Sequence, residues 1–452
     1  MLTATVALAL AAGLDGAAAL RHAATLSALG PHPWGSPRGR AAAEYVASQL
    51  RAAGVDVRLQ PFEAHGIRGT NVIGTLRGSS PEFVVLGAHH DTAPGAPGAY
   101  DDAAGVGVLL EAARVLAAVP RERTIVLASW DGEEAWSTGL TTTSGSRAFI
   151  KDLGPASRQM VAALAIEMCG WRSGTPVLHP IAYADPLRPG ELAIAPARVV
   201  RAMLAGSRRA GVGLGIGDPF LSWVYQPAVR TFRVRLYGDD LSFLQEGLPA
   251  TFTSDSTFTR FYPSYHQPTD TPDKLDADAL GRMGTAVVGG VEALLSLPVS
   301  REAERDWFAA FGFVAGAPAL WAAGLLALLP GIVAASRESG RSLGARVAQG
   351  AIAVFLMWRH LVPALWALAL PALISGAWRR RSMTWAALLP PLLLATVGGV
   401  AWARGMVSGL WVGAGDVAAA LAGLALLFVP AVTGPRKRSH GSPRRPGLPR
   451  KR

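Results

Sequence analysis

The runs FVVLGAHH (residues 83–90), AGVGVLLEAARVLAA (104–118) and TIVLASW (124–130) decide the fold expected for the first part of the chain. Two short apolar runs enclose a segment whose apolar residues recur with helical periodicity, which is typical of two strands joined by a helix. Similar runs precede and follow them, so short strands alternate with amphipathic helices. The pattern predicts an α/β fold: a mainly parallel, mixed sheet sandwiched by helices.

Neighbouring segments extend this alternation over residues 15–300. Ser36 and Pro37 suit the N-cap and first turn of a helix that runs to Gly54. Further elements are expected as strands at 55–64, 70–78 and 161–168 and as helices near 145–153 and at roughly 274–297. Ligands of such sheets bind at the carboxyl ends of the strands, so functional residues are expected there.

Charge is distributed unevenly along the chain. The 452 residues carry a formal net charge of +11, and half of them are apolar, which allows a large core. Residues 1–306 contain 27 basic and 30 acidic side chains, whereas residues 307–452 contain 16 and 2. The basic excess therefore belongs to the second part. Cys169 is the only cysteine, which excludes an intrachain disulfide.

The first 14 residues are apolar and contain no Lys or Arg. They are too few for a spanning helix and lack the basic start of a signal peptide. They are either the end of a truncated export signal or anchor, or a plain first helix. The predicted organisation is an apolar segment at 1–14, a globular domain at 15–300 and a charged linker at 301–306.

From Trp307 onward the sequence has the character of a membrane protein. Residues 307–335 contain no charged side chain over 29 positions, more than the roughly 20 needed to cross a hydrocarbon core. Residues 382–403 form a second uncharged run, and residues 405–432 contain a single charge. Residues 347–378 are apolar except for a central Arg-His pair, which favours a hairpin of two short helices. We predict four to six transmembrane helices within residues 307–432.

Basic residues predict the orientation of these segments. They gather at 337–346, at 379–381 and in the tail 433–452, which carries eight of them. The positive-inside rule then predicts a multi-pass cell-membrane protein with an extracytoplasmic globular domain and a cytoplasmic tail. Because the tail adjoins a spanning segment, we expect it to bind the lipid bilayer rather than nucleic acid.

Polar clusters occur where five apolar runs of the domain end. They are His89-His90-Asp91, Asp101-Asp102, Glu133-Glu134, Glu167 and His266. Burying adjacent carboxylates is costly unless something neutralises them, and bound divalent cations would supply that charge. Imidazole and carboxylate ligands without thiolate suit zinc, with cobalt or manganese as alternatives. Two neighbouring ions activate water for hydrolysis, and one glutamate of the pair can then act as general base.

This ordered set resembles the co-catalytic zinc aminopeptidase family, which includes bacterial leucyl aminopeptidases, over roughly residues 20–298. The resemblance implies a phosphorylase/hydrolase-like fold. GAHHDT is similar to the family's His-x-Asp stretch, which implies that His89 binds metal and that Asp91 supports it in catalysis. YDDAAG is similar to Asp-x-Ala-Ser-Gly, which implies that Asp101 bridges two metals ahead of an unusual cis peptide bond, although Ala104 replaces the serine.

The remaining motifs imply the other roles. DGEE makes Glu133 the general base and Glu134 a metal ligand, while LAIEM and YHQPTDTPDKL supply Glu167 and His266 as ligands. The resemblance thus implies one zinc held by Asp101, Glu134 and His266 and another held by Asp101, His89 and Glu167. His90 is expected to have a structural role.

Three residues are expected to line the substrate pocket. Asp239, in YGDDLSF, is similar to a Ser-Asp-His stretch near the family's pocket, although its neighbours differ from that pattern. Trp136 and Tyr265 lie close in sequence to the ligands Glu134 and His266 and are aromatic candidates for the pocket wall.

Two functions follow from the resemblance, and a third is kept from a different class. Hydrolysis of N-terminal peptide bonds, by a membrane-anchored aminopeptidase with two zinc ions, is the leading reading. Glutaminyl-peptide cyclotransferase, with one zinc, is the alternative. The ten residues 135–144 after Glu134 favour it, because aminopeptidases resemble a shorter form, whereas His89 and Glu167 together favour two metals. An inactive ligand-binding ectodomain is the third reading, and an intact Glu133 argues against it.

Overall fold

The computed structural model describes residues 14–134, 143–172, 174–179, 183–184, 192–217, 232–234, 238–257, 260–302, 307–310, 313–316 and 407–410. The chain divides into two units, the first comprising Met1–Leu320 with Val397–Trp411 and the second Trp321–Thr396 with Val412–Arg452. All described residues belong to the first unit.

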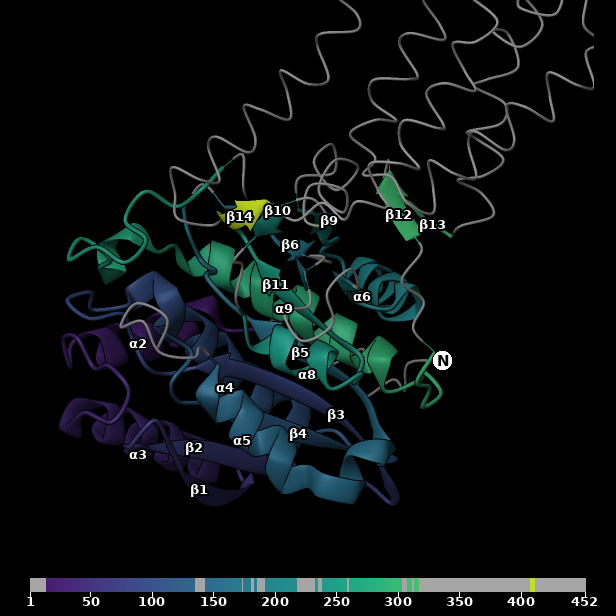
Figure 1. Ribbon diagram of the computed structural model, residues 1–452, viewed down its shortest axis with the longest axis horizontal. Helices are drawn as coiled ribbons and strands as arrows, with labels where there is room; N and C mark the ends of the chain where they lie inside the picture. Colours follow the sequence, from purple (N-terminus) through teal and green to yellow (C-terminus); the bar gives the residue numbers. More distant parts are fainter. Residues whose placement is uncertain are drawn as a thin grey trace, which may run out of the picture. The chain divides into compact units, whose positions relative to one another are not determined.

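The described residues form a mixed sheet of eight strands at the centre of this unit (Figure 1). In spatial order the strands are β1 (Asp56–Ala64), β2 (Ile67–Leu76), β4 (Arg123–Trp130), β3 (Ser80–His89), β5 (Met160–Ile166), β11 (Ala250–Ser254), β6 (Val177–His179) and β9 (Gly215–Ile216). The four central strands β4, β3, β5 and β11 run parallel to one another. Strands β1, β2 and β4 pair antiparallel, as do β11 and β6. The predicted α/β fold with a mixed sheet is confirmed.

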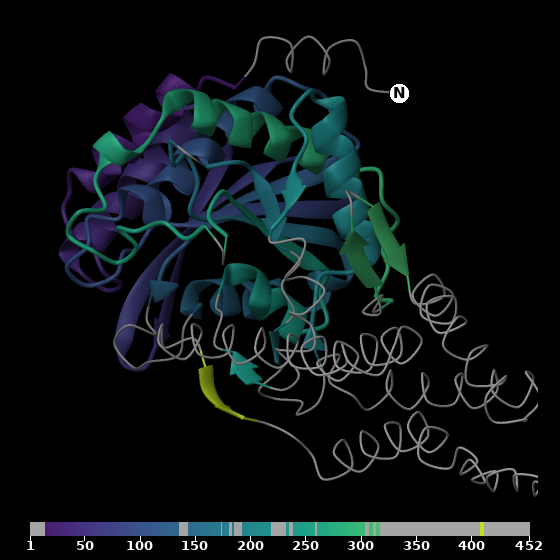
Figure 2. The same ribbon diagram turned by 90° about the horizontal axis from the view of Figure 1, so that it is seen from above.

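Helices cover both faces of the sheet (Figure 2). One face packs against α2 (Gly16–Ser27), α3 (Pro37–Ala52), α4 (Ala104–Ala117), α6 (Ala197–Arg209) and α9 (Ala277–Leu294), and the other against α5 (Ser144–Leu153) and α8 (Asp239–Gln245). Strand β3 shows why two cores form: Val84 and Leu86 enter the first, whereas Phe83 and Val85 enter the second. Successive side chains of a strand point to opposite faces, so a strand buried on both sides is apolar throughout.

Local signals in the sequence set the helix ends. The Ser36 hydroxyl accepts the N–H of Gly39 at 2.9 Å and Pro37 opens α3, as expected. The helix ends at Ala52, before Gly54 at φ +79°. Helix α9 begins at Ala277, later than expected, because Asp276 caps it. The remaining short elements are the turn Ala99–Ala103, 3-10 turns at Gly154–Gln159 and Pro272–Lys274, and strands β7 (Tyr183–Ala184) and β8 (Leu192–Ala193).

Two short antiparallel pairings include residues of runs in which the sequence predicts membrane spans. Strands β12 (Trp307–Ala310) and β13 (Phe313–Gly316) pair antiparallel, and β14 (Val407–Leu410) pairs with β10 (Phe232–Val234). Residues 307–310, 313–316 and 407–410 are therefore strands, and the four to six spanning helices expected within 307–432 stay a prediction. A short uncharged, apolar run does not by itself distinguish strand from helix.

The other membrane predictions concern residues beyond this description. Over the described ranges, we find no helix whose length and apolar character would let it span a bilayer. The rest of residues 307–432, the tail 433–452 and residues 1–13 lie outside the described residues.

Candidate metal centre

The polar clusters predicted from the sequence meet at the carboxyl ends of the central strands. His89 is the last residue of β3, Glu133 and Glu134 follow the end of β4, and Glu167 follows β5. These strands are parallel neighbours, so their carboxyl ends lie side by side. Asp101 joins them from the turn that leads into α4.

Asp101, Glu134 and His266 form the first donor group, and their ligand atoms all lie within 4.8 Å of one another. The Nε2 atom of His266 is 2.9 Å from Glu134 Oε1 and 3.2 Å from Asp101 Oδ2. Both carboxylates are buried. The structure thus brings together the three residues expected to hold one zinc.

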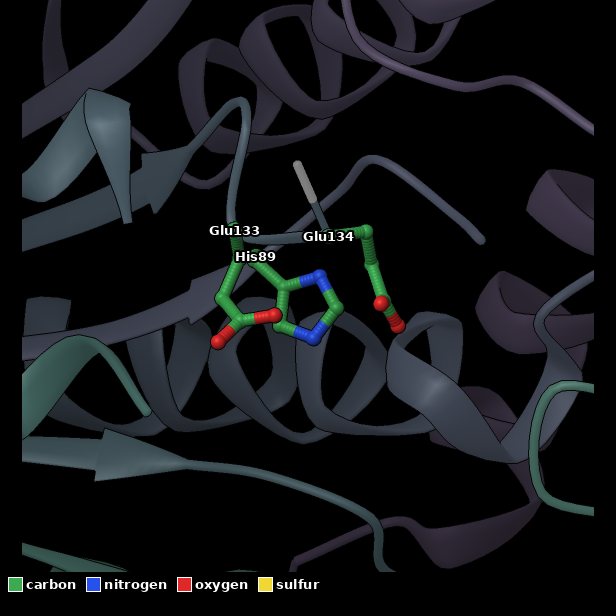
Figure 3. Close-up of side chains that lie close together, drawn as sticks. All are labelled: His89, Glu133 and Glu134. Carbon is green, nitrogen blue, oxygen red and sulfur yellow. The ribbon is translucent and has the colours of Figure 1, made fainter. Parts of the chain in front are cut away.

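His89 lies on the other side of Asp101, and its Nε2 atom is 3.3 Å from Asp101 Oδ1. One oxygen of Asp101 therefore faces each imidazole, as a carboxylate between two metals would require. His89 also forms a second donor group with Glu133 and Glu134 (Figure 3). The figure shows the two glutamates reaching from one loop toward the histidine at the end of β3.

Glu167 has a different arrangement from the one expected. Its Oε1 atom accepts the backbone N–H of Asp239, at the start of α8, at 3.0 Å. Within the described part of the chain, neither donor group includes Glu167. Asp239 itself is buried, and burial raises the pKa of its carboxyl to about 7. The second expected ligand set, Asp101, His89 and Glu167, stays a prediction, because a carboxylate that accepts one N–H can also bind a metal.

Asp91 supports both sides of the site. Its Oδ1 and Oδ2 atoms accept the backbone N–H groups of Glu133 and Glu134, each at 3.1 Å. Its carbonyl oxygen lies 3.1 Å from His89 Nδ1. A proton on Nδ1 leaves Nε2, which faces Asp101, available to a metal. The resemblance implied the contact of Asp91 with His89 but not its hydrogen bonds to the N–H groups of Glu133 and Glu134.

Burial and mutual charge shift the pKa values of the donors strongly. Burial raises the pKa of Glu134 to about 7, and the negative charge of Asp101 adds to the rise. Burial also raises the pKa of Glu133 well above its usual value. Burial would lower the pKa of His266, but the carboxylates of Asp101 and Glu134 outweigh it and raise the pKa to about 10.

These donors fit a zinc centre. The ion pairs that the cluster contains join carboxylates to His89 and His266. Imidazole nitrogen and carboxylate oxygen are ligands that zinc accepts in catalytic sites. A divalent cation would replace the histidine protons as the charge that keeps buried carboxylates ionised.

The substrate-pocket candidates divide into two cases. The Tyr265 ring stacks on His266, with 3.7 Å between ring centroids, so it lies beside the first donor group. Trp136 lies outside the described residues. Trp130, at the end of β4, is fully buried against Phe149 and Phe243 and belongs to the core.

Asn71 is a supporting residue that sequence reasoning missed, and Asp102, expected at a cis peptide bond, has a contact that was not predicted. Asn71 Oδ1 accepts the N–H of Asp131, and its Nδ2 donates to the Gly145 carbonyl at 2.8 Å. Asp102 Oδ1 accepts the N–H of Met168, beside Glu167, at 3.1 Å. The peptide bond between Asp101 and Asp102 is cis, as the resemblance implied. A polar Asn inside the apolar run TNVIGTL was the available signal.

The fold and this donor set suit a zinc-dependent enzyme of the kind that the resemblance to aminopeptidases implies. Residues 71–291 match the model of Peptidase family M28, so this part of the chain is similar to that family.

Relatives identified by sequence agree with this assignment. The chain is 26% identical to the uncharacterized protein YfbL of Escherichia coli over 273 residues, which cover 56% of this chain and 78% of the relative. It is 32% identical to leucine aminopeptidase 1 of Neurospora crassa over 173 residues, 34% of this chain and 41% of the relative. The chain therefore spans less than half of that leucine aminopeptidase.

Solved structures share the fold. An aminopeptidase from Aneurinibacillus sp. strain AM-1 superposes with a TM-score of 0.51 at 17% identity, covering 63% of this chain and 94% of that one. Glutaminyl cyclase from Porphyromonas gingivalis superposes with a TM-score of 0.50 at 22% identity, covering 62% and 98%. At these identities the likeness concerns architecture alone.

Proposed function

We propose that this protein is a zinc aminopeptidase that removes residues from the N-terminus of peptides. The observation that carries the proposal is the convergence of Asp101, Glu134 and His266, with Glu133 directly beside them. The similarity to leucine aminopeptidase 1 of Neurospora crassa supports the reaction, and the M28 domain supports the metal.

The chain's own residues divide the chemistry among them. Asp101, Glu134 and His266 would hold one zinc, and Asp101, His89 and Glu167 a second. When bound, zinc lowers the pKa of water and polarises the peptide carbonyl. Glu133 accepts the proton of the attacking water and passes it to the leaving amine as the C–N bond breaks. Its buried position beside His89 and Glu134 suits this role.

Asp91 and Tyr265 organise the surroundings of this reaction. The Asp91 carboxylate holds the N–H groups of both glutamates and thereby fixes where the base stands relative to its neighbour. Tyr265 covers one face of the His266 ring and excludes water from it. We propose that the aromatic surface beyond His266 receives the side chain of the substrate's first residue.

Membrane anchoring is part of the same proposal. The uncharged runs within residues 307–432 would span a bilayer, and the basic groups between them would face the cytoplasm. The catalytic domain would then act on extracytoplasmic peptides, with the tail 433–452 bound to anionic lipid.

A second candidate function is glutaminyl-peptide cyclotransferase with a single zinc. The observation in its favour is Glu167, whose carboxylate accepts the Asp239 N–H rather than joining a donor group. In this reaction the α-amino group of an N-terminal glutamine attacks its own side-chain amide, and ammonia leaves. Glu133 would again accept and return the proton.

Metal analysis combined with two assays tests the proposal. The purified full-length chain is loaded with zinc and incubated with aminoacyl substrates and with Gln-peptides. Two zinc ions per chain and release of free amino acids support the aminopeptidase. One zinc with release of ammonia from Gln-peptides would transfer the proposal to the cyclotransferase. Zinc binding without either product would favour a ligand-binding ectodomain.

A further inference from the structure

Asp270 is a fully buried carboxylate to which the chemistry above gives no role. It lies four residues after His266 and accepts three hydrogen bonds. Its Oδ1 atom accepts from the Tyr100 N–H at 2.9 Å and from the Tyr262 hydroxyl at 3.0 Å. Its Oδ2 atom accepts the Asp101 N–H at 3.3 Å.

These bonds connect the two segments that carry Asp101 and His266. Asp101 stands in the turn Ala99–Ala103, and the Asp270 carbonyl also accepts the N–H of Ala99 at 3.3 Å. The turn is therefore held at three consecutive N–H groups by one residue. No other polar side chain among the described residues is hydrogen-bonded to the N–H of Asp101.

The segment that carries His266 is fixed from the same point. The Tyr262 ring lies on the Tyr100 ring with 4.1 Å between centroids, and both rings are buried. The Tyr262 hydroxyl donates a hydrogen bond to Asp270. This bond joins residues 262 and 270 on either side of His266 and so fixes the loop that contains it. His266 has φ +58°, a conformation that non-glycine residues adopt only when their surroundings hold them there.

We propose that Asp270 is a positioning residue that sets the zinc affinity of the group Asp101, Glu134 and His266. It does so by fixing the Asp101 turn against the His266 loop before metal binds. This inference rests on the zinc centre of the proposed function and adds to it the residue that preorganises the centre. Outer residues that orient ligands commonly change metal affinity by about 10–100-fold when replaced.

The variant Asp270→Asn tests this role with little change of volume. The remaining carbonyl oxygen can still accept from Tyr100 and Tyr262, whereas the new amide nitrogen faces the Asp101 N–H as a second donor. Zinc affinity is measured on the metal-free full-length chain by competition with a chromophoric chelator. We expect a loss of about 10-fold or more. Co²⁺ loaded at the same group should show a changed visible spectrum, because ligand orientation alters the coordination geometry.

Two further variants separate positioning from general stability. Asp273→Asn removes the same charge three residues away, where the carboxylate is exposed and bonded to Thr271 and Lys274. It should leave zinc affinity unchanged. Tyr262→Phe removes one of the three donors to Asp270 but keeps the ring on Tyr100, and a loss of a few-fold is expected. It also carries the test if Asp270→Asn fails to fold.

The outcomes distinguish this proposal from the proposed function. Folded Asp270→Asn and Tyr262→Phe proteins that bind zinc as tightly as the wild type, with unchanged Co²⁺ spectra, would overturn the positioning role alone. A wild-type chain that binds zinc tightly, and less tightly in these variants, but hydrolyses no peptide would support this role and remove the aminopeptidase. A wild-type chain that binds no zinc would overturn both.

Discussion

The two sides of the metal centre share Asp101 but differ in how completely the chain assembles their donors. On one side, His266 Nε2 lies 2.9 Å from Glu134 and 3.2 Å from Asp101. On the other, His89 lies 3.3 Å from Asp101 and shares a donor group with Glu133 and Glu134, whereas Glu167 accepts the N–H of Asp239 and belongs to neither group. On the first side, hydrogen bonds to Asp270 hold the Asp101 turn against the loop that contains His266. On the second side, Glu167 accepts a hydrogen bond from the first residue of α8. Preassembled donors lose less conformational freedom on binding, so the two sides should bind zinc with unequal affinity.

Glu133 serves both sides, and its removal should have the largest effect. Glu133→Gln keeps the volume but cannot accept a proton, so kcat for peptide hydrolysis should fall by about 10²–10⁴-fold. Zinc content should be unchanged if Glu133 acts as the base, and a loss of zinc would instead make Glu133 a ligand in its group with His89 and Glu134. Steady-state kinetics and metal analysis measure the two quantities. Glu44→Gln, an exposed glutamate on α3, is the control and should retain activity. Unchanged kcat in Glu133→Gln would remove the base assignment.

Removing one histidine from each side measures the inequality directly. His266→Ala deletes a ligand of the complete group and should weaken the tighter zinc site by more than about 100-fold, beyond the loss typical of supporting residues. His89→Ala should leave the tighter site nearly intact and abolish only the weaker one. Isothermal titration of metal-free protein gives both affinities. Equal losses in the two variants would mean that the sides do not differ as described.

The variant Glu167→Gln tests whether the chain binds a second zinc ion beside His89. If Glu167 turns to the metal, the variant should bind one zinc instead of two and hydrolyse peptides about 10–100-fold more slowly. If its bond to Asp239 persists in the loaded protein, zinc stoichiometry should not change. The second result, accompanied by ammonia release from Gln-peptides, would favour the cyclotransferase.

Asn71 supports the glutamate loop that both sides share, and its replacement should act mainly on stability. Asn71→Ala leaves the buried Asp131 N–H and Gly145 carbonyl without their side-chain partner. We expect the free energy of unfolding to fall by about 2–4 kcal/mol, since each unsatisfied buried group costs about 1–3 kcal/mol. Urea unfolding measures this change. Gln49→Ala, whose side chain is bonded to Ser48 near the surface, should change stability by less than about 0.5 kcal/mol.

Lowering the pH should show how much the neutral form of His90 contributes to stability. This residue adjoins His89 in sequence, but its Nδ1 atom contacts the Ser129 hydroxyl. Burial lowers the pKa of His90 to about 4, compared with 6.5 in the unfolded chain. Between these pH values the unfolded chain binds more protons, so this contribution to stability is complete above pH 6.5 and is lost as pH falls toward 4. Urea unfolding of metal-free protein should show that His90→Gln reduces the pH slope by at most about 1.4 kcal/mol per pH unit. An identical slope would place His90 in contact with water.

Local patterns in the sequence predicted five of the eight strands of the sheet but not β11, β6 or β9, and the roles of the residues in the centre came from the family resemblance. Apolar runs set the strands, and polar residues at the ends of parallel strands had to converge. The hydrogen bond from the Asp239 N–H to Glu167 was not predictable, because it depends on where the first residue of α8 lies relative to the end of β5. Asp270 lies within YHQPTDTPDKL, yet its bond to the Asp101 turn spans 169 positions and leaves no local signal. The strands at 307–316 show the limit of composition, since uncharged runs fit either element.

A zinc-loaded crystal structure, with anomalous scattering recorded at the zinc edge, tests the central claim most directly. We predict a strong peak about 2.0–2.2 Å from ligand atoms of Asp101, Glu134 and His266, and a weaker peak beside His89. Hydrolysis by crystals or solutions in which zinc lies elsewhere, with these three side chains uncoordinated, would contradict the account.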